Sequence, residues 1–426
     1  MTINEASGKH PSETAEEGND SPTSDDNEHI KPRLRLFLSI DLVGSTALKQ
    51  GKIGERQGGG SSDLEEIERS SRWRDPILYF YQVFQTKFAQ KWKRAEVELK
   101  LYIPTRIEDF EEPKFWKAAG DELIYEQLIS NSYQACWSVR AWISAAEEFR
   151  KELRNKYPSL DVKMTAWVAG FPVINSEVVL RKTTHNNENI SEDNSSDSMA
   201  VLMQQLEKYY SSDKKDAVLD YIGPSMDIGF RLCSLSTPRE MPISLELAYI
   251  LSEVRKDLID RGNRLSDKST PQENISNLPE TTLRYMGRKS LKGVLDGRSY
   301  PVFWLDVAEK DSIESAEDAI SERKKITPDQ CLRLFKAFVE EVNNPLLIWE
   351  PYLGELKEKD GVIKSAHPPV HKKLLAKWLN NRKASGAVES ERENSENERS
   401  VATDQSNALP APELSQEEIL APPRAC

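Results

Sequence analysis

Apolar and polar residues alternate along LRLFLSIDL, residues 34–42 of the 426-residue chain. A period of two predicts a half-buried strand whose aliphatic side chains pack on the core. Asp41 lies on the opposite face, together with Phe37 and Ser39, and Gly44 follows where the strand ends. A carboxylate beside main-chain carbonyls at a strand end suits a divalent cation. The alternative that this stretch leaves open is an Asp that closes a turn or caps the next helix.

The rest of the chain mixes helical and extended patterns. Apolar residues recur at helical spacing over 75–88 and 135–157, which predicts two helices packed on the core. Residues 115–126 read as two short strands around an Ala-Gly-Asp-Glu turn, and 162–174 alternates in part like another strand. Residues 283–304 read as a final hairpin. Helical and extended patterns therefore both occur along the chain.

Candidate chemical groups recur at the ends of these elements. Lys117 precedes Asp121 by four residues in the first predicted hairpin. The turn Gly223-Pro224-Ser225 starts a helix on which Asp227 and Arg231 share one face. Lys292 lies near the turn of the final hairpin. Taken singly, these residues have ordinary interpretations: a surface ion pair for Asp227 with Arg231, and a solvated lysine for Lys292.

Composition and charge exclude several classes of protein. The net charge of −12 and the pI of about 5.2 argue against nucleic-acid binding, which requires a basic face. The polar, acidic N-terminus does not resemble a secretory or transit peptide, and no apolar run reaches the roughly 20 residues of a membrane span. Four cysteines without paired spacing indicate neither a disulfide framework nor a zinc site. We expect a soluble, cytoplasmic protein.

Four segments of the chain resemble a known family. FLSIDLVGST, WKAAGDELIYE, DYIGPSMDIGFR and LKGVLDGRSYPVFW resemble, in this order, the four signatures of class III nucleotide cyclases. The resemblance spans about residues 34–306. It implies an α+β fold with a ferredoxin-like βαββαβ catalytic domain that forms a homodimer with active sites at the interface. We therefore expect a disordered N-terminus over 1–31, a catalytic domain over 32–307 with a polar insertion at about 183–199, a helical segment over 308–383 and a disordered tail over 384–426.

The resemblance also implies roles for individual residues. Asp41 and Asp121 would bind two divalent ions, Mn²⁺ or Mg²⁺, with the main-chain carbonyl of Leu42 as a further ligand. Two neighbouring carboxylates repel each other unless cations lie between them, and paired ions about 3.5–4 Å apart can serve phosphoryl chemistry. The substrate-binding and catalytic roles would fall to Lys117 and Asp220 at the base edge, Arg231 in the transition state, Lys292 at the terminal phosphates and Asp227 where the family usually has an asparagine that orients the ribose.

Within this family, one branch is most similar in sequence. SIDLVGSTALK, YFYQVFQTKF, WKAAGDEL and AGFPV are similar to the pyrimidine cyclases of bacterial Pycsar anti-phage systems. Membership would imply UTP conversion to cUMP, or CTP conversion to cCMP, as a second messenger that switches on an effector protein. Lys117 donates and Asp220 accepts, a pair that fits adenine, cytosine and uracil alike. Phe37 would fill space that a smaller pyrimidine leaves empty, ordinary packing being the alternative.

Three other functions remain compatible with the sequence. An adenylate cyclase that uses ATP would carry the same pair of Lys117 and Asp220. A cyclase domain without activity would bind a nucleotide as a sensor, although neither metal-binding carboxylate nor the arginine is missing here. An interaction protein would act through the helical segment 308–383.

Overall fold

The structure is a computed structural model that describes residues 32–50, 73–102, 111–181, 198–211, 217–265, 282–320, 325–351, 371, 373–378 and 380. The strands are β1 (Arg33–Val43), β2 (Lys114–Ala119), β3 (Glu122–Ile129), β4 (Asp161–Phe171), β5 (Ser176–Arg181), β6 (Ala217–Ile222), β7 (Glu240–Ile243), β8 (Thr282–Ser290) and β9 (Ser299–Asp306). The helices are α1 (Ser45–Gln50), α3 (Arg74–Tyr102), α4 (Ser132–Lys156), α5 (Ser198–Ser211), α6 (Pro224–Cys233), α7 (Leu245–Leu265), α8 (Ser312–Ile320) and α9 (Pro328–Val342). The expected disordered ends, 1–31 and 384–426, and most of the insertion at 183–199 lie outside the described residues.

Within the described ranges, seven strands form one sheet in the order β2-β3-β1-β4-β7-β9-β8. Neighbouring strands are antiparallel except for β4 and β7, which are parallel. The order β1-α3-β2-β3-α4-β4 along the chain is the predicted βαββαβ arrangement. The α+β fold class is confirmed. A separate two-stranded sheet pairs β5 with β6.

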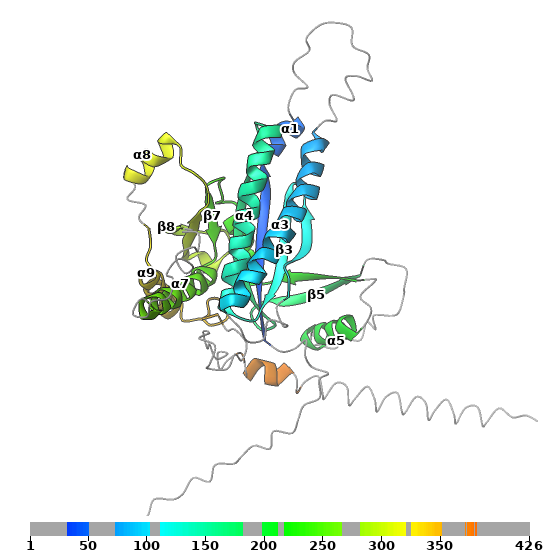
Figure 1. Ribbon diagram of the computed structural model, residues 1–426. Coiled ribbons are helices and arrows are strands. Elements are labelled where there is room, and N and C mark those ends of the chain that lie inside the picture. The colour runs from blue at the N-terminus through cyan, green and yellow to red at the C-terminus, as the bar shows by residue number, and fades with distance from the viewer. Residues whose placement is uncertain are drawn as a thin grey trace, which may run out of the picture. The chain divides into compact units, whose positions relative to one another are not determined.

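Two long helices cover one face of this sheet. The aliphatic residues of β1 belong to one buried cluster that also contains the aromatic stripe of α3 and the apolar face of α4. Figure 1 shows α3 and α4 lying side by side along β1 and β3. The helical spacing of Phe80, Phe84 and Phe88 places all three rings in this core, where Phe84 and Phe88 each meet Trp142 edge to face. The sequence prediction for these elements is confirmed.

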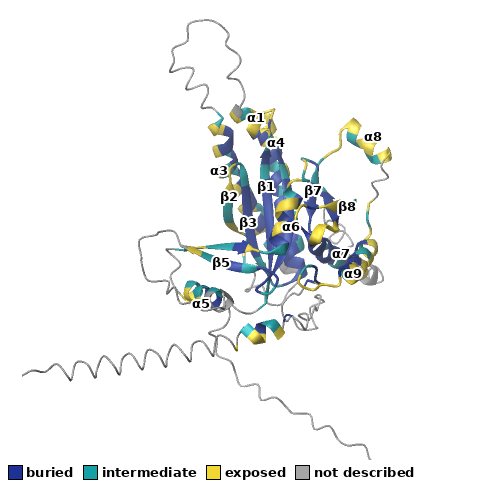
Figure 2. Ribbon diagram, turned by 180° about the vertical axis from the view of Figure 1, so that it is seen from behind, coloured by how far each residue is buried: buried dark blue, intermediate teal, exposed yellow. Residues whose placement is uncertain are grey.

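The second face of β1 is covered as well, so the prediction of a half-buried strand is wrong. Phe37 has no exposed surface and stacks on Trp167 of β4 with ring centroids 5.4 Å apart. Helix α6 covers this side of the sheet, seen in Figure 2. A Cβ atom on Gly229 would lie 2.3 Å from the ring of Trp167, so only glycine allows α6 to approach this closely.

A buried ion cluster lies at the start of β1. Arg35 is 6% exposed and contacts two carboxylates, Glu126 of β3 at 2.6 Å and Glu177 of β5 at 2.9 Å. Arg33 also pairs with Glu177. A buried guanidinium requires such partners, because an uncompensated charge would cost several kcal/mol. The cluster fixes the β5–β6 pair to the central sheet.

The helical segment predicted for 308–383 contains α8 and α9. Helix α9 packs on α7, where the rings of Tyr249 and Phe335 lie 4.4 Å apart. Helix α8 has no buried residue, and its Asp318 pairs with Arg239 at 2.6 Å and Lys310 at 2.7 Å. The left-handed conformation of Asn343 ends α9. Residues 345–347 form a turn and 349–351 have no regular structure, so the helix expected here is not present.

The chain divides into two compact units. The first comprises residues 1–186 and 205–366 and holds the main sheet with its helices. The second comprises 187–204 and 367–426, and its described residues are helical. No helix in the described part of the chain combines the length and apolarity needed to cross a bilayer.

A buried carboxyl group in α7 makes stability depend on pH. Glu246 is 1% exposed, lies 3.4 Å from the Tyr300 hydroxyl, and burial raises its pKa from 4.5 to about 7. The folded protein therefore prefers the protonated acid. This preference contributes fully below the unfolded pKa of 4.5 and is lost as the pH rises through about 7. We expect Glu246→Gln, which stays neutral, to be more stable than wild type at pH 8 by up to about 3 kcal/mol, and little changed at pH 4.5.

Urea unfolding of both proteins at the two pH values measures this difference. Glu112→Gln, at an exposed position, is the matched control and should show no such pH dependence. An advantage of Glu246→Gln that is equal at both pH values would contradict the linkage.

Candidate active site

Two carboxylates come together where β1 ends. Asp41 lies near the C-terminal end of β1, and Asp121 lies in the tight turn between β2 and β3 that Gly120 makes with a φ of 69°. The main-chain N–H of Leu42 donates to the carbonyl of Asp121 at 3.1 Å. This hydrogen bond holds the turn against the end of β1, which brings the two acidic residues into electrostatic contact.

Each carboxylate has its own lysine. Lys163 is the register partner of Asp41 on β4, and its Nζ lies 3.1 Å from Asp41 Oδ2. Lys49, in the last turn of α1, lies 3.3 Å from Asp121 Oδ1, and the Ser45 hydroxyl donates to the same carboxylate. The side chains of Asp41 and Asp121 are 30% and 21% exposed. They are therefore partly desolvated, yet open to solvent on one side.

The electrostatics of the pair favour an added cation. Burial raises the pKa of Asp41, Lys163 lowers it, and the negative charge of Asp121 raises it again, with a net increase. A divalent ion between the carboxylates would remove this repulsion. Oxygen donors of this kind fit Mg²⁺ or Mn²⁺, and since no third His, Cys, Asp or Glu completes a cluster among the described residues, main-chain, water and phosphate oxygens would fill the remaining positions.

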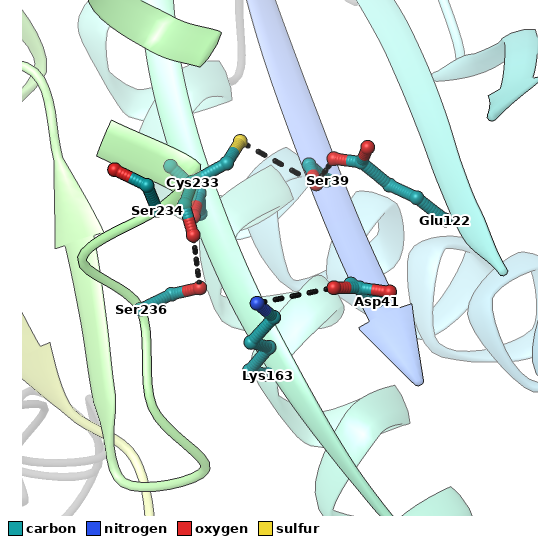
Figure 3. A pocket seen from close by; sticks show the side chains of 8 residues that line it. Ser39, Asp41, Glu122, Lys163, Cys233, Ser234 and Ser236 are labelled. Carbon is teal, nitrogen blue, oxygen red and sulfur yellow. Dashed lines mark hydrogen bonds and ion pairs between the residues drawn. The ribbon is translucent and has the colours of Figure 1, made fainter. Parts of the chain in front are cut away.

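A polar pocket of about 200 Å³ opens beside Asp41 and is shown in Figure 3. Burial raises the pKa of Glu122, whose carboxylate accepts from the Ser39 hydroxyl at 2.5 Å. Burial also raises the pKa of Cys233 to about 12, so this thiol is protonated at neutral pH and is not a nucleophile. The lining residues are Ser39, Asp41, Glu122, Lys163, Thr165, Cys233, Ser234 and Ser236.

Lys117 and Asp220 form an ion pair although 103 residues separate them. The Nζ of Lys117 on β2 lies 2.9 Å from Oδ1 of Asp220 on β6. Their side chains are 37% and 29% exposed, so a ligand can reach both. The pair presents a hydrogen-bond donor and an acceptor side by side, which is the arrangement needed to read the edge of a nucleobase.

Arg231 and Lys292 also meet. The Arg231 Nε on α6 donates to the main-chain carbonyl of Lys292 at 3.1 Å. Both side chains are exposed, as is Asp227 one turn earlier on the same helix. No ion pair joins Asp227 to Arg231 among the described residues, which leaves the guanidinium head group of Arg231 able to bind an anion.

Phe37 does not reach a surface. Its fully buried ring packs between Trp116, Trp167 and Tyr221, with centroids between 5.2 and 5.4 Å. A direct contact with a base requires exposed ring surface, so this position favours the packing alternative. Its ring instead supports Trp116, which lies under Lys117.

The structure therefore assembles the sequence-predicted residues as three pairs: Asp41 with Asp121, Lys117 with Asp220, and Arg231 with Lys292. Arg231 and Lys292 do not line the pocket beside Asp41.

Sequence reasoning missed Lys163, Lys49 and Trp116. Lys163 could be found only from the register of β1 with β4, and Lys49 only from the position of α1 against the β2–β3 turn. Trp116 gave one local signal, as an aromatic residue directly before Lys117.

No protein-family model and no curated protein sequence shows significant similarity to this chain. Cyclases are among the solved structures with a similar fold. The adenylyl cyclase CyaB from P. aeruginosa is 11% identical, with a TM-score of 0.33 over 66% of this chain and 97% of its own. The guanylyl cyclase Cya2 is 12% identical, with a TM-score of 0.31 over 66% of this chain and 94% of its own.

A third structure is the guanylate cyclase domain of RhGC from Catenaria anguillulae in complex with GTP. It is 9% identical, with a TM-score of 0.30 over 66% of this chain and all of its own. At these identities and scores, the assignment of a reaction rests on the residues of this chain.

The lysine beside Asp41 should compete with an added cation. In Lys163→Met, the two carboxylates lose part of their charge compensation, and the ammonium no longer repels a divalent ion. We expect the metal-free variant to lose less than about 1 kcal/mol of stability, because the pair is partly exposed. We expect millimolar Mn²⁺ to raise its melting temperature more than that of wild type.

Thermal unfolding with and without Mn²⁺ measures both effects. Lys91→Met is the matched control, since Lys91 pairs with Glu148 at 2.6 Å and its side chain is 20% exposed. An equal response of the Lys163 variant and wild type to Mn²⁺ would rule out competition at Asp41.

Proposed function

We propose that the protein is a class III nucleotide cyclase that converts UTP to 3′,5′-cyclic UMP and pyrophosphate. The observation that carries the proposal is the convergence of its candidate residues in pairs. Asp41 meets Asp121, Lys117 meets Asp220 across 103 residues, and Arg231 meets Lys292 across 61 residues. The resemblance of four sequence segments implies a shared metal site for the first pair and a shared base edge for the second, which supports the proposal. Random surface charges would not be expected to assemble in this way.

The reaction needs no covalent nucleophile on the protein. The ribose 3′-hydroxyl gives its proton to solvent, and its oxygen forms a bond to the α-phosphorus. The bond from that phosphorus to the oxygen that bridges to the β-phosphorus breaks, and pyrophosphate leaves with that oxygen. The protonated, half-buried thiol of Cys233 takes no part as a nucleophile. The protein has to hold the triphosphate, align the ribose and place positive charge where the phosphoryl oxygens become more negative.

Asp41 and Asp121, with the carbonyl of Leu42, would hold two divalent ions, which supply activation of the 3′-hydroxyl and charge neutralisation of the triphosphate when bound. Arg231 places its planar guanidinium against the α-phosphoryl oxygens. Lys292 holds the terminal phosphates as a point charge. Asp227 lies on the same face of α6 and accepts a hydrogen bond from a ribose hydroxyl.

The pair of Lys117 and Asp220 reads the base. Uracil offers a carbonyl acceptor for the lysine and an N3–H donor for the carboxylate, while cytosine and adenine offer a ring nitrogen beside an amino group. We choose UTP because the sequence is most similar to the pyrimidine cyclases, with CTP next and ATP as the alternative. The product would serve as a second messenger that activates an effector protein in anti-phage defence.

The product profile of the purified protein tests this proposal. Given Mn²⁺ and each of the four nucleoside triphosphates, we expect cUMP to form fastest and pyrophosphate to appear in equal amount. Faster consumption of ATP or GTP than of both pyrimidine nucleotides would reject the pyrimidine specificity but not the assignment as a cyclase. Nucleotide binding without any cyclic product would favour a sensor domain.

The candidate charged residues of a single chain do not all line one pocket. Asp41 lines the polar pocket, whereas Arg231 and Lys292 are exposed and do not line it. Two copies related by a two-fold axis would place the arginine and lysine of each against the carboxylates of the other. We therefore propose a homodimer with two shared active sites, built from the catalytic domain at 32–307.

Mixing two inactive variants tests the shared sites. Asp41→Ala and Arg231→Ala should each be inactive, because every site in either homodimer lacks one essential group. With free subunit exchange, half of the dimers are heterodimers with one complete site, so activity should recover to about a quarter of wild type. Turnover of UTP by the co-expressed proteins measures the recovery, and size-exclusion of differently tagged chains confirms heterodimers. Heterodimers that remain inactive would contradict shared sites.

A further inference from the structure

A β-bulge interrupts β2 next to the candidate base-reading lysine. Phe115 pairs with Tyr125, but Lys117 pairs with Ile124, so Trp116 is an extra residue on this strand. In a regular strand, neighbouring side chains point to opposite faces. The bulge re-aims them, which brings the Lys117 Nζ to 3.8 Å from the centroid of the Trp116 ring.

The Trp116 ring is itself fixed from several sides. Its indole N–H donates to the main-chain carbonyl of Leu219 at 3.2 Å. Phe37 and Tyr221 meet the ring edge to face at 5.4 and 5.1 Å, and Phe230 of α6 lies 6.3 Å away. Phe37 and Tyr221 are buried members of a hydrophobic cluster against which Trp116 packs. Trp116 therefore has a single, well-supported orientation.

One side chain thus sets the positions of both members of the ion pair. The cation–π contact fixes the ammonium group of Lys117, and the indole hydrogen bond fixes Leu219, the residue directly before Asp220. Without such support, a half-exposed pair of a long lysine and a carboxylate would sample many rotamers and bind weakly. The ring also offers an apolar floor on which the lysine stem can lie.

We infer that Trp116 is a positioning residue that sets the nucleobase selectivity of the protein through Lys117 and Asp220. The inference rests on the proposed function, in which this pair reads the base. A donor and an acceptor discriminate among bases only when their separation and direction are fixed, because a mobile lysine can satisfy many acceptor positions. Loss of the ring should therefore weaken the discrimination between bases more than it slows the chemical step.

Two substitutions separate the contacts of Trp116. Trp116→Phe keeps an aromatic face for Lys117 but loses the donor to Leu219, whereas Trp116→Leu loses both. We expect the ratio of kcat/KM between the preferred and the next-best nucleotide to fall about 2- to 5-fold in the Phe variant and about 5- to 20-fold in the Leu variant, mostly through KM. Trp92→Phe, at a buried position of α3, is the matched control and should leave the ratio unchanged.

Binding of 3′-deoxynucleoside triphosphates provides a readout without turnover, since these analogues lack the hydroxyl that cyclises. Titration calorimetry of the three proteins and wild type should show the same loss of selectivity in the dissociation constants. An unchanged ratio in a folded Trp116→Leu or Trp116→Phe protein would overturn the inference, as would an equal loss in Trp92→Phe. If wild type discriminates among these analogues in binding but forms no cyclic product, the cyclase activity is rejected and the role of Trp116 is not. If wild type binds no nucleotide, both the cyclase activity and the role of Trp116 are rejected.

Discussion

The pairing of β1 on both sides is the constraint on which the rest of the structure depends. This strand is antiparallel to β3 and to β4, and both of its faces are buried over most of its length. A shift of one residue in either register would move Phe37 and Asp41 to the face covered by α3 and α4. The correct register instead places Glu122 and Lys163 opposite Asp41 on the two neighbouring strands. The site is therefore a consequence of strand pairing.

Charge compensation follows from the same register. Lys163 pairs with Asp41 and Lys49 pairs with Asp121, so two positive charges face the two carboxylates at this strand end. Both carboxylates nevertheless remain partly exposed. By contrast, Arg231 of α6 and Lys292, between β8 and β9, are exposed, and neither has an ion pair with an acidic side chain among the described residues. Both side chains are therefore open to an anionic ligand.

Much of this architecture could be predicted from the sequence, because β1, α3 and α4 carry regular apolar periods. The positions of Asp41, Asp121 and Arg231 followed from turns and helix spacing. The contacts that depend on register could not: Lys163 meets Asp41 only through the pairing of β1 with β4. The segment that forms β7 and α7 was not assigned, although its apolar residues recur at helical spacing from Leu247 onward. The bulge at Trp116 was equally hidden, since nothing in the local sequence marks where a strand gains an unpaired residue.

The absence of a side chain at Gly229 has a consequence for how far α6 stands from the sheet. The helix backbone rests directly on the flat ring of Trp167, so the thickness of one indole defines their separation. Arg231 and Asp227 extend from the opposite side of the same two turns of helix. The distance of both side chains from the sheet therefore depends on the thickness of the Trp167 ring. Even a methyl group at this position would lift the whole helix and displace both side chains together. Gly229 thus sets the spacing between α6 and the sheet, and the space above the Trp167 ring limits which residues can replace it.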